Sequence, residues 1–231
     1  MVEGSKSDDI GDIKKTVLTQ LEGNYLHSIP KSSTFFYPKD EIEQAVKNSF
    51  KKIDSLSISR SGLSGLILKI TEKAPSAIVC VGFHDDNDSD QDCYFSDKDG
   101  YVYEKSPQFS EGVYPKYYIT RNNNQEVLGT TFISTDLFRN LQAFVANAGK
   151  SNISPLGLFI GDGGKYELYV KNLDESEAVV YFDNRQPLEK TLSNFIAFWN
   201  DSLKKKKNAT STPAFEYINL RYGNNIFYAT K

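Results

Sequence analysis

The fold of the first part of this chain is indicated by the stretch LILKITEKAPSA, which covers residues 66–77. Every second side chain in its first half is apolar, which is the period of a half-buried β-strand. A similar alternating run, Leu56 to Arg60, precedes it across a turn at Gly62, and the two runs together predict a β-hairpin. Pro75 cannot donate a hydrogen bond to a neighbouring strand, so it marks the expected end of a first domain.

Two amphipathic helices are expected before this hairpin. The first runs from Ser7 to Gly23, and its apolar side chains recur at spacings of three and four; they are Ile10, Ile13, Val17, Leu18 and Leu21. The second follows Pro38, has acidic residues in its first turn, and carries Ile42, Ala45, Val46 and Phe50. Residues 1–74 therefore predict two helices on a small mixed sheet, with residues 2–4 as the end of a truncated first strand.

Residues 75–231 are predicted to form a larger, mainly antiparallel β domain with two helices, which makes the fold class α+β. The strand runs are 76–82, 92–96, 101–104, 153–160, 165–171, 177–182, 215–221 and 226–230. Residues 106–126 are expected to form a loop that contains Tyr and Pro. Helices are expected from Ser134 to Gly149 and from Pro187 to Lys207, because apolar side chains recur there with helical spacing.

Charge and hydropathy restrict the possible partners. The 231 residues include 27 Lys and Arg against 30 Asp and Glu, a formal net charge of −3. This balance provides no overall attraction for nucleic acid or anionic lipid. No apolar run approaches the roughly 18 residues of a membrane-spanning helix, and the N-terminus has no signal-peptide pattern. Because a helix begins almost at once, we expect an N-terminal membrane anchor and most of the first strand to be absent from this sequence.

The two cysteines, Cys80 and Cys93, lie in two strand runs on either side of an acidic loop. This placement favours a cross-strand disulfide, and closing a loop of this length would stabilise the fold by about 3 kcal/mol. A disulfide implies an oxidising compartment. The alternative is a pair of small buried side chains in a cytosolic protein.

Two charged motifs have both a chemical and an ordinary structural interpretation. The acidic loop at 85–92 places carboxylates on alternate residues, as a calcium loop does, but Gln91 and Asp97 stand where Gly and a bidentate Glu are needed. A solvated loop is the better interpretation. Lys204 to Lys207 could contact anionic lipid, nucleic acid or wall polymer, but cations at a helix C-terminus also complement the helix dipole.

The sequence predicts no enzymatic, cofactor or metal site. The two histidines, His27 and His84, do not occur in a zinc-binding pattern. No serine lies in a Gly-x-Ser-x-Gly turn, and the glycines at 161–164 lack the Lys and Ser or Thr of a phosphate-binding loop. A wall hydrolase remains an alternative, but it would need a cleft with several converging titratable groups.

Three motifs together resemble the FtsQ/DivIB family of bacterial cell-division proteins. The stretch 66–77 is similar to the end of the family's POTRA domain, with Lys73 in place of the usual Arg. Residues 93–103, CYFSDKDGYVY, are similar to a family hairpin. Residues 217–224, YINLRYGN, are similar to its closing strand, with Asn219 in place of the common Asp. The motifs occur in the family's order and span nearly the whole chain, whereas the paired cysteines are not a general family feature.

The resemblance implies a scaffold without catalytic activity, composed of a POTRA-like domain at 1–74 and an FtsQ-type β domain at 75–231. Such a protein is a single-pass protein of the cytoplasmic membrane, anchored by an N-terminal helix, with this region on the extracytoplasmic side at the septum. FtsB-like and FtsL-like divisome proteins are its implied partners, and the FtsB-like partner adds a strand to the C-terminal sheet. Another POTRA-containing protein of envelope assembly or secretion is the alternative, although no tandem POTRA repeats occur here.

The same resemblance implies which residues contact or adjoin the partner. They are Arg221, Tyr222, Asn224, Asn225, Ile226, Phe227 and Tyr228. Arg221 would hold a partner carboxylate, and Tyr222 and Phe227 would supply apolar contact area. Because strand residues alternate between faces, one set of these side chains must instead point into the domain core.

Overall fold

The computed structural model describes residues 2–4, 9–25, 29–62, 65–84, 92–110, 112–120, 126–172, 174–206 and 214–231. The chain divides into two compact units, Met1–Ala74 and Pro75–Lys231, so the boundary falls at the proline that interrupts the sequence pattern. Each unit combines helices with a sheet. The described part of the chain therefore belongs to the α+β class.

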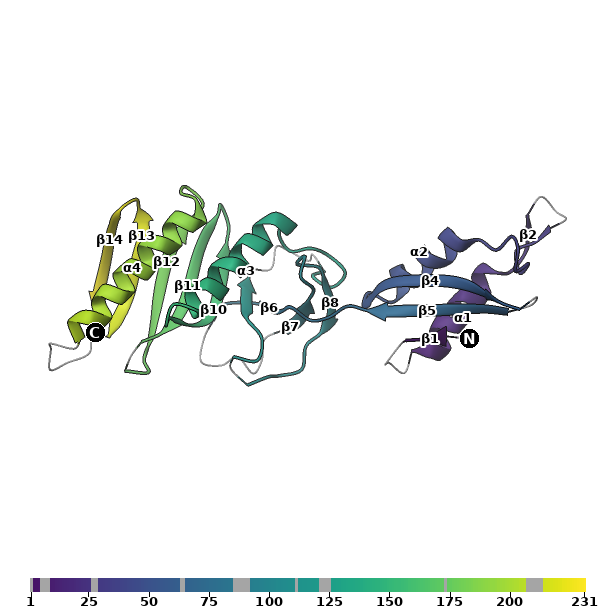
Figure 1. Cartoon of the computed structure of the whole chain (residues 1–231), viewed down its shortest axis with the longest axis horizontal. Coiled ribbons are helices and arrows are strands. Elements are labelled where there is room, and N and C mark those ends of the chain that lie inside the picture. The colour runs from purple at the N-terminus through teal and green to yellow at the C-terminus, as the bar shows by residue number, and fades with distance from the viewer. Residues whose placement is uncertain are drawn as a thin grey trace. The chain divides into compact units, whose positions relative to one another are not determined.

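The first unit packs two helices on a three-stranded mixed sheet (Figure 1). Its elements are β1 (Val2–Glu3), α1 (Ile10–Gln20), β2 (Asn24–Tyr25), β3 (Ile29–Pro30), α2 (Lys39–Ser49), β4 (Ile53–Ser61) and β5 (Gly65–Glu72). The sheet order is β1-β5-β4, with β1 parallel and β4 antiparallel to β5. The predicted hairpin is confirmed, and β2 and β3 pair separately as a short antiparallel ribbon.

The core of this unit is a single apolar cluster between the helices and the sheet. Its buried residues are Ile13, Val17, Ile42, Val46, Ile53, Leu56, Ile58, Leu68 and Ile70. The expectation that Ile10 and Leu18 share this face is wrong, since they are 42% and 52% exposed. Ile13 and Val17 lie one above the other at a spacing of four, whereas Leu18 is turned about 100° away from Val17 by the helical geometry.

The second unit is a nine-stranded mixed sheet with α3 and α4 lying across one face (Figure 1). Its elements are β6 (Ala77–Val81), β7 (Asp92–Ser96), β8 (Val102–Lys105), β9 (Lys116–Ile119), α3 (Thr135–Gly149), β10 (Ser154–Gly161), β11 (Lys165–Lys171), β12 (Glu177–Asp183), α4 (Leu188–Lys206), β13 (Phe215–Tyr222) and β14 (Asn225–Thr230). The order is β14-β13-β12-β11-β10-β9-β6-β7-β8. Most neighbours are antiparallel, but β9 is parallel to β6 and β10, and β12 is parallel to β13.

The prediction of a continuous loop over residues 106–126 is wrong, because β9 occupies its middle and lies between β6 and β10. Tyr117 and Tyr118 in this strand are 1% and 0% exposed. A strand buried on both faces shows no alternation of apolar and polar side chains. Because β9 has only four residues and its partner strands are distant in sequence, the local sequence pattern indicates this strand only weakly.

The large sheet separates two clusters of buried side chains, because successive strand residues point to opposite faces. On the helix-covered face, Phe138, Phe144, Phe195 and Trp199 pack against the strands in the larger core. The opposite face carries a smaller cluster of buried residues, which are Ile78, Cys80, Tyr118, Phe159 and Tyr169. Both faces of the central strands are therefore covered by apolar side chains.

Candidate partner-binding edge

The strand β14 ends the nine-stranded sheet, and within the described residues only one of its edges is paired. That edge pairs antiparallel with β13, and the turn between them uses Gly223 at φ 72°, where glycine meets no steric penalty. The outer edge offers the backbone N–H and C=O groups of alternate residues of this six-residue strand. It is therefore a candidate template for a further strand.

Aromatic rings lie on both faces of this edge. Phe227 and Tyr228 are consecutive in β14, so their side chains point to opposite faces of the sheet. The ring of Tyr228 lies 5.2 Å from that of Phe198 in α4, and the ring of Phe227 lies 5.2 Å from that of Tyr222. Tyr222, Phe227 and Tyr228 are 57%, 53% and 53% exposed. A strand added here would meet an accessible ring on either face.

The other expected partner residues of β14 and its turn divide by exposure. Asn224 and Asn225 are exposed at the turn. Ile226 is half-buried and packs against the larger core, so its role is structural. The structure thus brings the expected residues together on one hairpin and directs one of them inward.

Arg221 is half-buried and its side chain is held against the sheet. The guanidinium lies 5.2 Å from the centre of the Tyr181 ring, and its Nε donates a hydrogen bond to Asn219 Oδ1 at 3.0 Å. These contacts hold the side chain over β13 and β12, on the side of β13 away from β14, and they leave the two terminal nitrogens unused. Those nitrogens can still hold a carboxylate.

A second arginine links β13 to the end of β12. Arg185 donates from Nη2 to the carbonyl of Arg221 at 3.2 Å and from Nε to Asp183 Oδ2 at 2.8 Å. Burial alone would raise the pKa of the Asp183 carboxyl, but the hydrogen bonds and charge of Arg185 outweigh it and hold that pKa below its usual range. The pair therefore contributes stability above the unfolded-state pKa of Asp183, and this contribution is lost as the pH falls through the lower folded pKa.

The start of β13 depends on Asn172, which directly follows β11. The parallel pairing of β13 with β12 covers only residues 217–219 against 179–181. Asn172 Nδ2 donates to the Phe215 carbonyl at 2.7 Å, and Asn172 Oδ1 accepts the Phe215 N–H at 3.1 Å. Asn172 and Phe215 are both 4% exposed. A single buried side chain thus supplies both hydrogen bonds that a neighbouring strand would supply.

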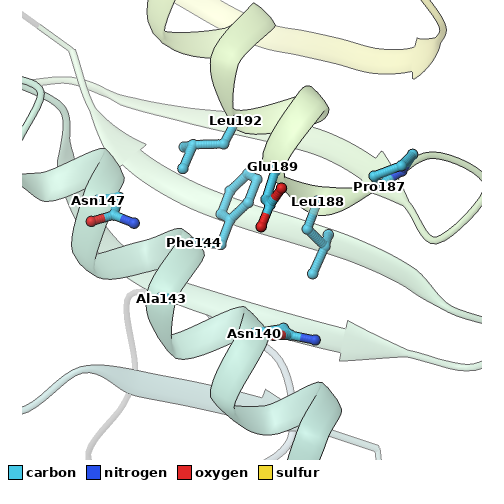
Figure 2. Close-up of a pocket in the computed structure, with 8 residues that line it drawn as sticks. All are labelled: Asn140, Ala143, Phe144, Asn147, Pro187, Leu188, Glu189 and Leu192. Carbon is cyan, nitrogen blue, oxygen red and sulfur yellow. The ribbon is translucent and has the colours of Figure 1, made fainter.

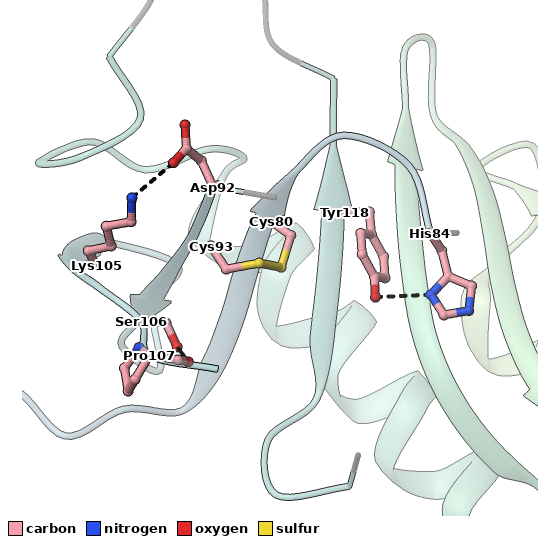
Figure 3. Close-up of a disulfide and its surroundings, with 8 residues drawn as sticks. All are labelled: Cys80, His84, Asp92, Cys93, Lys105, Ser106, Pro107 and Tyr118. Atoms are coloured by element: carbon pink, nitrogen blue, oxygen red, sulfur yellow. Dashed lines mark hydrogen bonds and ion pairs between the residues drawn. A yellow bond between two sulfur atoms is a disulfide. The ribbon is translucent and has the colours of Figure 1, made fainter. Parts of the chain in front are cut away.

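Cys80 and Cys93 form the disulfide that the sequence predicted (Figure 3). They are paired directly across β6 and β7, with their Cα atoms 4.1 Å apart. Cys80 has no exposed surface. The bond lies within the buried cluster on the face opposite the helices and ties β7 to the central strands.

His84 follows β6 and contacts Tyr118, Glu177 and Tyr169 on the same face; Figure 3 shows the contact with Tyr118. Its Nε2 lies 3.1 Å from Glu177 Oε2, and its Nδ1 lies 3.0 Å from the Tyr118 hydroxyl. Because a carboxylate only accepts, Nε2–H donates to Glu177, and in the neutral imidazole Nδ1 accepts from Tyr118. The imidazole also lies 4.4 Å from the Tyr169 ring. Glu177 is 93 residues away in sequence, so no local motif could reveal this cluster.

Two buried tyrosines on opposite faces of the sheet, Tyr169 and Tyr117, have raised pKa values with simple causes. Burial raises the pKa of the Tyr169 hydroxyl, and the nearby Glu167 carboxylate raises it further. Burial likewise raises the pKa of Tyr117. Burial therefore favours the protonated form of both phenols.

Two pockets lie in the second unit. One of about 350 Å³ lies between α3 and the start of α4, and one of about 460 Å³ lies beside α3 at the start of β9 and β10. Glu189 is the one charged residue that lines the first pocket, whereas Tyr114, Lys116 and Tyr117 are titratable residues that line the second. Among the described residues, no three His, Cys, Asp or Glu side chains form a metal-binding group.

Several sequence motifs lie partly outside the described residues. These are His27, residues 85–91 of the acidic loop, and Lys207 of the lysine run. Asp92, at the end of the acidic loop, pairs with Lys105 Nζ at 3.1 Å, and Lys204 is exposed. Within the ranges that the structure describes, no helix combines the length and apolar character needed to cross a membrane.

No protein-family model matches the chain, and no curated protein matches it at a significant level. A functional assignment therefore depends on the sequence motifs and on the geometry of the C-terminal hairpin.

Proposed function

We propose that this protein is a non-enzymatic scaffold of the FtsQ/DivIB type, which holds FtsB-like and FtsL-like partners at the division septum. The FtsB-like partner would add a strand along the outer edge of β14. One observation carries the proposal: this edge has no strand partner among the described residues and bears half-exposed aromatic rings on both faces. Strand addition satisfies the backbone groups of such an edge, while side-chain contacts select the partner.

The remainder of the chain supports the same proposal. The first unit has the order strand, two helices and hairpin that a POTRA-like domain would have, apart from the short β2–β3 ribbon. The disulfide supports an extracytoplasmic location, because disulfides persist in oxidising compartments. The proposal also includes a membrane helix that would precede this region in the full-length protein.

The exposed rings define the partner strand that would fit. Side chains on one of its faces would pack beside Phe227 and Tyr222, and those on the other face beside Tyr228. An apolar residue at successive positions, rather than at alternate ones, would use both sets of contacts. Arg221 would have to turn from Tyr181 toward β14 to hold a carboxylate at one end of the added strand.

The test is the affinity for the extracytoplasmic segment of the FtsB-like protein of the same organism, measured by calorimetry. Phe227→Ser is expected to weaken binding at least tenfold, because it removes a half-exposed aromatic anchor from the edge. Arg221→Glu is expected to weaken binding as well, since it turns a charge pair into repulsion.

Two matched variants separate this interface from general surface effects. Phe83→Ser removes an aromatic ring of similar exposure, 59%, that lies outside β14, and Lys204→Glu reverses an exposed charge on α4. Both are expected to bind nearly as the parent does. Folded Phe227→Ser and Arg221→Glu proteins with parental affinity would place the partner elsewhere.

A further inference from the structure

The pocket between α3 and α4 has an apolar base and a polar rim (Figure 2). Phe144 is 2% exposed and stacks on Phe182 of the sheet with ring centres 4.5 Å apart. Leu188 and Leu192 of α4 line the same pocket. Asn140 and Asn147 line it from α3 and are exposed, which places two amide groups on its rim.

The one charged side chain lining this pocket is Glu189, in the first turn of α4. Figure 2 shows its side chain projecting from the helix into the pocket. The carboxylate forms no ion pair or side-chain hydrogen bond with any described residue. An acidic residue in a first turn complements the helix dipole, and this alone could account for Glu189. The dipole, however, does not account for an apolar pocket beneath an unpaired carboxylate.

We propose that this pocket binds a basic side chain, arginine or lysine, from an apolar peptide segment of a partner protein. Such side chains bury their methylene stems on apolar surface while the charged head stays at the rim. Here the stem would lie against Phe144, Leu188 and Leu192, and the head would reach Glu189. The amide oxygen of Asn140 can accept one of its remaining N–H groups, and the amide oxygen of Asn147 keeps one lone pair beside the hydrogen bond that it accepts from Lys150 Nζ at 3.4 Å. This inference uses no residue of β14 and does not depend on the proposed strand addition.

The probe is the tripeptide acetyl-Leu-Arg-Leu-amide, titrated into the whole 231-residue chain and followed by NMR. The neutral analogue with citrulline in place of arginine has nearly the same shape. We expect the arginine peptide to bind about fivefold more tightly, the effect of one partly exposed charge pair. The side-chain amide signals of Asn140 and Asn147 should shift on binding.

Two variants distinguish the pocket from a dipole effect. Glu189→Gln should remove the preference for arginine over citrulline. Asp136→Asn is the matched control, because Asp136 lies in the first turn of α3, is exposed and does not line the pocket. It should leave the preference intact.

Three results would overturn the proposal. The first is equal binding of the arginine and citrulline peptides by the parent protein. The second is an equal loss of preference in Glu189→Gln and Asp136→Asn. The third is a concentration-dependent dimer, seen by sedimentation, that Glu189→Gln abolishes, because the pocket would then hold a basic side chain of a second copy of this chain.

Discussion

Replacing both cysteines by alanine, Cys80→Ala with Cys93→Ala, is expected to lower the free energy of unfolding of the second unit by about 3 kcal/mol. The two residues are 13 positions apart, and the cross-link removes the corresponding loop entropy from the unfolded chain. Cys80 is fully buried, so losing its sulfur also removes packing contacts within the cluster of Tyr118 and Phe159. Equilibrium unfolding in urea, followed by near-ultraviolet circular dichroism, measures the change.

A reducing agent separates the cross-link from the packing. Dithiothreitol should destabilise the parent protein by a similar amount and leave the double alanine variant unchanged. A parent protein whose urea midpoint is the same with and without reductant would contradict a stabilising disulfide. Two reactive thiols in the unreduced, unfolded parent protein would show that the disulfide does not form. The extracytoplasmic location would then lose the support of the disulfide.

The disulfide and the main helices could be predicted because their signals are local. Cys80 and Cys93 flank one loop, and the helix α3 has several apolar residues at helical spacing in sequence. The terminal hairpin could also be placed, because a Gly-Asn-Asn turn separates two alternating runs. The edge position of β14, by contrast, follows from the order of all the strands in the sheet, and no local pattern determines it.

The elements that escaped prediction depend on contacts between distant residues. The strand β9 is buried on both faces and pairs in parallel with β6 and β10, so Tyr117 and Tyr118 resembled part of a loop. The contact of His84 with Glu177 joins residues that are 93 positions apart. The two hydrogen bonds between the Asn172 side chain and the Phe215 backbone join residues that are 43 positions apart. Polar side chains of this kind give no periodic signal, although Asn172 positions the start of β13, the strand that pairs with β14.

Asn172→Leu is expected to lower the free energy of unfolding by about 4 kcal/mol, because it leaves two buried backbone groups of Phe215 without partners at about 1–3 kcal/mol each. Leucine has the branching of asparagine but larger methyl groups, so crowding at the former hydrogen-bond distances adds to this loss. The loss should be concentrated in β13 and β14, which join the rest of the sheet through a short parallel ladder. Amide hydrogen exchange should therefore accelerate more in residues 215–230 than in the central strands.

Ser176→Ala is the matched control. It removes the hydrogen bond from Asn172 Nδ2 to Ser176 Oγ at 3.1 Å and the one that Ser176 Oγ donates to Asp174 Oδ1 at 2.6 Å, but it leaves the Phe215 contacts in place. We expect it to change the unfolding free energy by less than about 1 kcal/mol. An Asn172→Leu protein with parental exchange rates in β13 would show that the hydrogen bonds of Asn172 are not needed to hold this strand. Faster exchange in β13 would mean that β14 is held less firmly against the sheet. The affinity for an added strand should then fall, although no residue of β14 has changed.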